Sequence, residues 1–131
     1  MRAVRFGAIL WTIVALVLNA YIHVTLAPTV TPVDPTLMSL GTLYLAEAAV
    51  NVLAAILLLV RPRVWSALFA VLVALVGLMT LVASVWMPLQ LPLGLPTVPM
   101  SSWTTEKAIS AAAQVFIVIS GTVVAVTARR R

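Results

Sequence analysis

The sequence contains no cysteine among its 131 residues. This absence excludes disulfide bonds, thiolate metal sites, iron–sulfur clusters and thiol nucleophiles. Charge is also scarce, because only 8% of the residues are charged, against about 25% in an ordinary soluble domain. A chain of this composition has too little polar surface to stay dissolved, so we expect an integral membrane protein.

Acidic residues and histidine are scarcer still. Asp34, Glu47 and Glu106 are the only acids, and His23 is the only histidine. A metal site built by one chain needs several such ligands, so we predict none. The sequence also lacks a Gly-rich phosphate loop, a nucleophile–base pair and the local context of a catalytic serine. This pattern favours a non-enzymatic protein without deciding the question.

What the sequence has instead is long apolar runs. Four runs exceed the ~20 residues that a helix needs to cross ~30 Å of hydrocarbon. They cover residues 6–27, 36–60, 64–87 and 104–128. The connecting stretches 28–35 and 88–102 are rich in proline, which stops helices. We predict one all-α domain over residues 1–131, an antiparallel four-helix transmembrane bundle.

Two helix starts carry local signals. Asp34 and Pro35 suit the N-cap and first position of the second helix. Ser102 suits the N-cap of the fourth, with Glu106 in its first turn.

Two alternatives to four spanning helices stay open. The first run resembles a secretory signal peptide with a poor cleavage site at Leu18-Asn19-Ala20, although it exceeds the ~7–15 residues of a signal core. Some segments are alternatively re-entrant.

The basic residues predict orientation. Every Lys and Arg except Lys107 lies at the termini or in the Arg61-Pro62-Arg63 turn, and such residues are enriched on the cytoplasmic side. We therefore predict that both termini are cytoplasmic. Membrane orientation explains the net charge of +5 better than nucleic-acid binding does, so we do not expect nucleic acid as a partner. An interfacial aromatic belt is predicted from Trp11, Tyr21, Trp65, Trp86 and Trp103.

The least expected residue in these runs is Glu47, because an ionisable group in mid-membrane costs about 2.5–3.5 kcal/mol even on permissive scales. At ~1.5 Å per residue, polar residues of all the predicted helices lie near its level. We predict that they line a polar cavity in the outer half, opening toward the proline-rich loops. The candidate ligand-binding or proton-carrying residues are Asn19, His23, Tyr44, Glu47, Asn51 and Gln114.

These residues have structural interpretations as well. A buried, protonated Glu47 that hydrogen-bonds Asn19 or Gln114 would only fix the helix register. A lone histidine such as His23 is usually interfacial or hydrogen-bonded. Glu106 is most simply a helix-start residue, whereas Lys107, the sole outer cation, attracts an anionic head group or reaches toward Glu47.

The last predicted outer loop carries a family resemblance. Leu93-Gly94-Leu95-Pro96, followed by Met100, Trp103, Glu106 and Lys107, resembles the last outer loop of small four-span membrane proteins of high-GC Gram-positive bacteria. His23 at the end of the first span, and Glu47 after the aromatic Tyr44, fit as well. Thr97-Val98-Pro99 departs from the more polar stretch expected there. The layout is also similar to that of the DoxX-like proteins. The resemblance implies a bacterial plasma-membrane location and names no ligand.

Three functional hypotheses follow. The first is an accessory subunit of a membrane assembly, self-associating or bound to other subunits, or a binder of a lipophilic ligand. The second is a small proton-coupled transporter that uses Glu47. The third is a redox protein with haem bound through His23, shared across a dimer or with another subunit. No cofactor is predicted, and haem is the only one considered.

Overall fold

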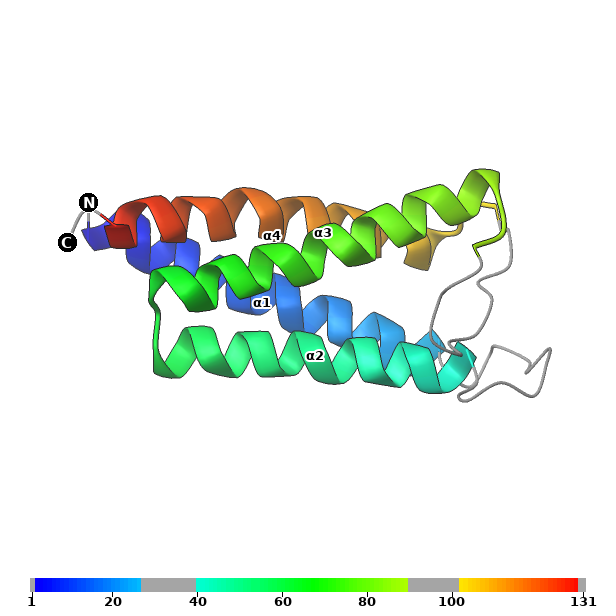
Figure 1. Ribbon diagram of the computed structural model, residues 1–131, viewed down its shortest axis with the longest axis horizontal. Helices are drawn as coiled ribbons and strands as arrows, with labels where there is room; N and C mark the ends of the chain where they lie inside the picture. Colours follow the sequence, from blue (N-terminus) through cyan, green and yellow to red (C-terminus); the bar gives the residue numbers. More distant parts are fainter. Residues whose placement is uncertain (1, 27–39, 90–101, 130–131) are drawn as a thin grey trace.

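The computed structural model describes residues 2–26, 40–89 and 102–129. Within these ranges the chain forms α1 (Arg2–Leu26), α2 (Leu40–Val60), α3 (Val64–Trp86) and α4 (Thr105–Arg129), which lie side by side along the long axis (Figure 1). All of them are long and apolar enough to cross a membrane. The all-α class and the four predicted membrane-length helices are therefore confirmed for the described residues.

The helix ends differ in places from the predicted runs. Helix α1 begins at Arg2 rather than at residue 6, because arginine is a good helix former and the helix continues past its apolar part. Helix α4 begins at Thr105, and its N-cap is Thr104, whose Oγ1 accepts the Lys107 N–H at 3.1 Å. The predicted cap at Ser102 is wrong, because Thr104 precedes the helix directly and bonds the backbone three residues on.

Other predicted features lie outside the described residues. These are the Asp34-Pro35 helix start, most of both proline-rich loops, and the Leu93-Gly94-Leu95-Pro96 run. Glu106 lies in the first turn of α4, as predicted.

A short turn connects α2 to α3. Ser66, in the first turn of α3, accepts the Arg63 N–H through its Oγ at 3.0 Å, and the same hydroxyl lies 2.6 Å from the Arg61 carbonyl. One buried serine thus satisfies backbone groups on both sides of Pro62. This turn lies at the same end of the molecule as both chain termini (Figure 1).

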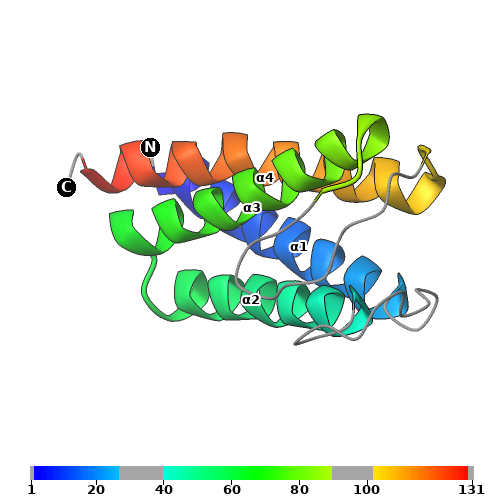
Figure 2. The ribbon, with the colours of Figure 1, turned by 45° about the vertical axis from the view of Figure 1, so that its right-hand side comes forward.

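The helices form a ring in which each packs against two neighbours: α1 against α2 and α4, and α3 against α4 and α2. Figure 2 shows α1 lying between α2 and α4 behind α3. Alanines such as Ala54, Ala70 and Ala74 pack around Leu16 and Ile117 in the core. Small residues allow helix backbones to approach closely where lipid provides no hydrophobic driving force.

The pair α2 and α3 packs least closely. Figures 1 and 2 show these two helices diverging from their connecting turn toward the other end of the molecule.

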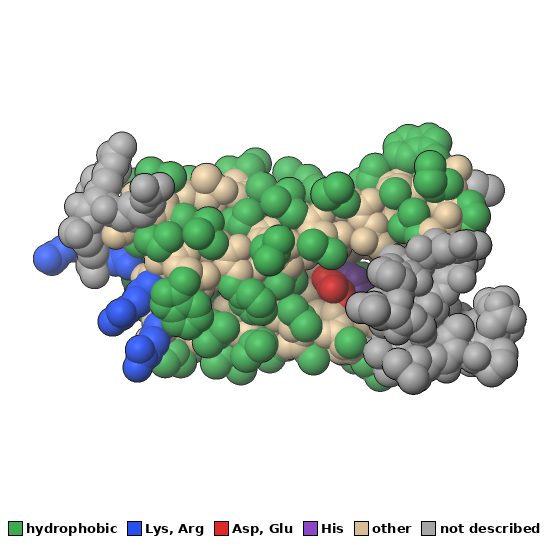
Figure 3. Space-filling model, in the orientation of Figure 1, with side chains coloured by type: hydrophobic (Ala, Val, Ile, Leu, Met, Phe, Trp, Pro, Cys, Tyr) green, Lys and Arg blue, Asp and Glu red, His purple; other side chains and the backbone are tan. Residues whose placement is uncertain are grey.

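Polarity is inverted relative to a soluble protein. Thr12, Asn19, Asn51, Ser66 and Gln114 are all fully buried, whereas large apolar side chains cover the outside. Figure 3 shows this apolar coat, with the Lys and Arg side chains that are visible on this face at one end. All the predicted belt aromatics are exposed: Trp11, Tyr21, Trp65, Trp86 and Trp103. Such a surface suits a hydrocarbon solvent.

Candidate functional site

A buried polar cluster connects three of the helices. It consists of Asn19 from α1, Glu47 and Asn51 from α2, and Ser110 and Gln114 from α4. Glu47 and Asn51 are four residues apart, as are Ser110 and Gln114, so each pair lies on one helix face. Four of these side chains are buried inside the ring, whereas Glu47 is half-buried at its edge.

Asn19 is the centre of the hydrogen bonding. Its Nδ2 donates to Asn51 Oδ1 at 3.1 Å, and its Oδ1 accepts the hydroxyl of Ser110 at 2.6 Å. Asn19, Asn51 and Ser110 are buried. At these positions, the space that the sequence predicts as a cavity is occupied by hydrogen-bonded side chains from α1, α2 and α4.

Glu47 is bonded within its own helix. Asn51 Nδ2 donates to the Glu47 carbonyl oxygen at 2.7 Å and to its carboxyl Oε1 at 3.1 Å. The predicted hydrogen bond from Glu47 to Asn19 or Gln114 is therefore wrong. The i,i+4 spacing on α2 places the Asn51 amide next to the Glu47 carboxyl group. Asn51 in turn accepts a hydrogen bond from Asn19, so Glu47 is linked to Asn19 only through Asn51.

Gln114 is the exception in the cluster. Its side chain is fully buried, yet neither Oε1 nor Nε2 has a hydrogen-bond partner. A buried polar group left without a partner costs about 1–3 kcal/mol. Unless something else bonds it, this amide destabilises the folded protein.

Gly77 of α3 provides the room for this arrangement. A Cβ atom at Gly77 would lie 2.5 Å from Gln114 Nε2 and 3.0 Å from Glu47 Oε1. The amide and the carboxyl group therefore converge on the same point of the α3 backbone, where any side chain would displace them. The absence of a side chain at Gly77 therefore leaves the space that these two groups occupy.

His23 and Tyr44 form a neighbouring pair. Their rings meet edge to face with centroids 5.7 Å apart, and His23 Nδ1 lies 2.8 Å from the Asn19 carbonyl oxygen. Because a carbonyl only accepts, Nδ1 carries the hydrogen. In the neutral ring Nε2 then holds the lone pair. The histidine therefore presents Nε2 as its acceptor.

Glu47, His23 and Tyr44 are only half-buried, unlike the amides behind them. Figure 3 shows an acidic side chain and the imidazole together on the face where α2 and α3 diverge. The polar cluster therefore reaches the molecular surface through its carboxyl group, between the two least closely packed helices.

Two polar side chains of α3 bond backbone carbonyls of their own helix. Thr80 bonds the Val76 carbonyl of its own helix, and Ser84 bonds that of Leu81. At the start of α4, Glu106 is exposed and Lys107 is half-buried. Among the described residues, no group of three or more His, Cys, Asp or Glu side chains is arranged to hold a metal ion.

Sequence reasoning missed three contributors. Residue spacing alone does not reveal that the Ser110 hydroxyl bonds Asn19 or that the Gly77 backbone lies against two side chains. The third is Ser120, whose hydroxyl lies 2.6 Å from that of Thr12. This second buried contact joins α1 to α4 nearer the basic end.

In the described residues, the fold and site define a protein with four helices of membrane-spanning character and a polar cluster whose carboxyl group is half-buried beside α3. Searches with this chain find no matching family model, curated protein or solved structure.

Proposed function

We propose that the protein binds a lipophilic molecule whose polar head group hydrogen-bonds Gln114 and Glu47. In this proposal the helices form an antiparallel bundle in a bacterial plasma membrane. Both termini are cytoplasmic, and the polar cluster lies in the outer half. The protein acts by binding and not by catalysis.

The unsatisfied amide of Gln114 carries the proposal. A glutamine side chain offers two donor hydrogens and an acceptor oxygen, and all of these lack partners in a fully buried position. A head group bearing a hydroxyl, amine or amide would supply both a donor and an acceptor. Glu47 Oε1 beside it would accept a further hydrogen bond from the same group.

The access route supports a lipophilic ligand over a water-soluble one. The half-buried carboxyl group lies on the face between α2 and α3. Exposed apolar side chains on these helices, such as Leu53, Leu72 and Val76, suit contact with hydrocarbon. A molecule already dissolved in the bilayer would reach Glu47 sideways, with its tail left among the lipids.

The test is to purify the protein from its membrane in mild detergent and identify co-purifying small molecules by mass spectrometry. Wild type should retain one molecular class at near-stoichiometric amounts. Gln114→Leu should retain at least about tenfold less, because two or more hydrogen bonds are lost at roughly 1 kcal/mol each. Thr122→Leu is the matched control, since the Thr122 hydroxyl is exposed and bonds only the Val118 carbonyl of its own helix.

Two results would overturn the proposal. One is equal retention by wild type and Gln114→Leu. The other is wild type that carries no compound beyond bulk lipid while remaining stable and fully folded.

A proton-coupled transporter is the second candidate, favoured by the hydrogen bonds from Glu47 through Asn51 to Asn19, whose carbonyl bonds His23. Proteoliposomes containing a pH-sensitive dye would test it. Wild type should carry a proton flux that Glu47→Gln abolishes, and equal fluxes would remove this candidate.

Two further hypotheses remain predictions. For haem, the Nε2 of His23 has the lone pair that an axial ligand needs, and a purified sample without a Soret band would discard it. For an accessory subunit, blue-native electrophoresis should show a complex larger than the monomer. Migration only as a small monomer would count against it.

A further inference from the structure

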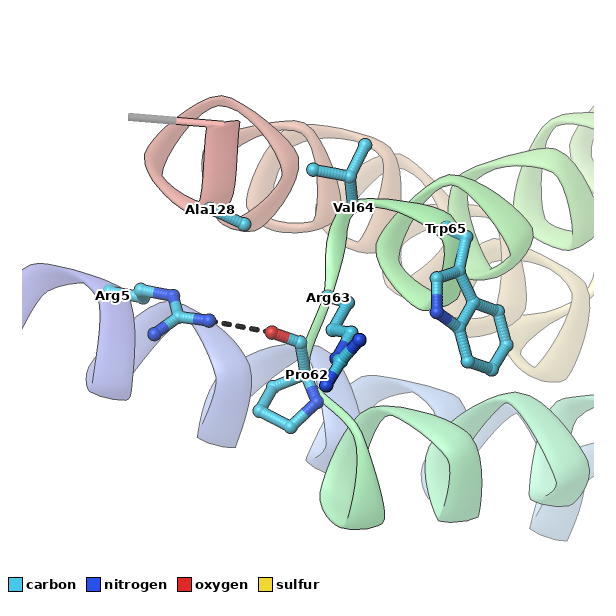
Figure 4. Close-up of a pocket in the computed structure, with 6 residues that line it drawn as sticks. All are labelled: Arg5, Pro62, Arg63, Val64, Trp65 and Ala128. Carbon is cyan, nitrogen blue, oxygen red and sulfur yellow. Dashed lines mark hydrogen bonds between the residues drawn. The ribbon is translucent and has the colours of Figure 1, made fainter. Parts of the chain in front are cut away.

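A second site lies at the end of the bundle where the α2–α3 turn is found. An open pocket of about 480 Å³ is lined by Arg5 of α1, the Pro62–Trp65 segment and Ala128 of α4 (Figure 4). We call it the basic pocket. It joins the start of α1, the α2–α3 turn and the end of α4, and none of its residues belongs to the polar cluster.

Arg5 is held in place in this pocket. Its Nη2 donates to the Pro62 carbonyl oxygen at 2.6 Å, and the side chain is half-buried. A guanidinium group carries five N–H donors, so one bond to a neutral carbonyl uses little of its donor capacity and does not neutralise its charge. Because the group is already oriented, less entropy is lost when an anion binds.

Two other side chains face the same space. Arg63 is exposed and extends beside Pro62, and the indole nitrogen of Trp65 is turned toward it (Figure 4). Among the described residues that line the pocket, two carry guanidinium groups and none carries a carboxylate. Val64 and Ala128 give the pocket an apolar side. Its chemistry therefore combines positive charge, an N–H donor and a short apolar wall.

The position of the pocket identifies its ligand class. It lies where the apolar helices end, at the level of lipid head groups in a spanning bundle, and basic pockets between membrane helices bind anionic lipid head groups. We propose that the basic pocket binds the phosphate group of an anionic phospholipid through Arg5, Arg63 and Trp65. The acyl chains then lie along the exposed apolar surface of the bundle. This site depends on the membrane location of the protein but not on a ligand at Gln114.

Native mass spectrometry of protein exchanged into mixed micelles of phosphatidylglycerol and phosphatidylcholine tests the proposal. Wild type should bind phosphatidylglycerol in preference to phosphatidylcholine. Arg63→Gln should weaken this binding about five- to tenfold, because it removes a direct charge-assisted hydrogen bond to the phosphate in addition to the general surface attraction. Arg61→Gln is the matched control: it removes the same charge from the same turn, but Arg61 does not line the pocket.

Arg5→Lys tests whether the planar guanidinium group bonds the phosphate through two N–H groups at once, because lysine keeps the positive charge but cannot form such a bidentate contact. It should also weaken binding, and circular dichroism would show that the fold is kept. If Arg61→Gln and Arg63→Gln weakened phosphatidylglycerol binding equally, general surface charge would explain the binding, and the proposed site would be overturned. A free anion would be the ligand if millimolar inorganic phosphate displaced the lipid and also bound in zwitterionic micelles in a way that depends on Arg63. That result would overturn the lipid assignment.

Discussion

Individual side chains in the polar cluster divide into satisfied and unsatisfied groups. Asn19, Asn51 and Ser110 bond one another across three helices, whereas the adjacent Gln114 bonds nothing. In a low-dielectric interior a fully bonded network fixes the packing, and an unbonded amide weakens it. This contrast separates the residues that hold the bundle from the residue that we assign to a ligand.

Asn51 should contribute measurably to stability. Asn51→Ala removes the acceptor of Asn19 Nδ2 and the donor to Glu47, and we expect a loss of about 1–2 kcal/mol, at the upper end of side-chain hydrogen bonds in membrane proteins. Steric trapping or detergent unfolding measures the free energy. Thr80→Ala is the control, since its hydroxyl bonds only its own helix. Equal effects for the two variants would contradict the network.

Gln114 should behave in the opposite way. In ligand-free protein, Gln114→Leu removes a buried amide without a partner, so it should raise the free energy of unfolding by about 1–3 kcal/mol. The same unfolding assay on delipidated protein measures this change. A destabilised Gln114→Leu variant would show that the amide bonds other protein groups, contrary to our assignment.

At the scale of the helices, apolar run length and proline position predict the elements well, because lipid requires every spanning backbone to satisfy its own hydrogen bonds. Their ends are less predictable. Thr104 and Ser102 are both good capping residues, and only the start of α4 at Thr105 decides between them. The polar residues of the helices predict a polar interior, but partners on different helices, such as Asn51 for Asn19, depend on how the helices rotate against one another.

Gly77 gives the clearest test of the α3 contact. Gly77→Ala places a methyl group 2.5 Å from Gln114 Nε2 and 3.0 Å from Glu47 Oε1. The overpacking cost of about 1–3 kcal/mol is offset in part by the gain of roughly 0.5–1 kcal/mol from alanine as a helix former, so we expect a net loss of about 0.5–2 kcal/mol. Gly7→Ala is the control, because nothing lies within 4 Å of its Cβ position, and alanine is the better helix former. The same unfolding assay should show Gly7→Ala unchanged or slightly stabilised. A neutral Gly77→Ala would mean that the cluster is loosely packed.

For the whole molecule, the main feature is an apolar exterior around a polar interior, with basic side chains at one end. Composition predicts this inversion, since so few charged residues have to be placed. The basic pocket was not predictable, because it depends on the position of the start of α1 beside the α2–α3 turn.

The absence of cysteine makes the proposed orientation directly testable. A single Ser102→Cys should react with a membrane-impermeant maleimide in intact cells, because Ser102 is exposed at the end that we assign to the outside. Arg61→Cys, equally exposed at the basic end, should react only after permeabilisation. The reverse labelling pattern would show that the bundle has the opposite orientation in the membrane and would contradict the proposed topology.

The central claim is that the Gln114 amide bonds a ligand that enters between α2 and α3. An experimental density map of the protein in lipid nanodiscs tests it most directly. We predict non-protein density within hydrogen-bonding distance of the Gln114 side chain and Glu47, extending toward the lipid between α2 and α3. A well-resolved map in which Gln114 bonds only protein groups, with α2 and α3 closed over it, would contradict the claim.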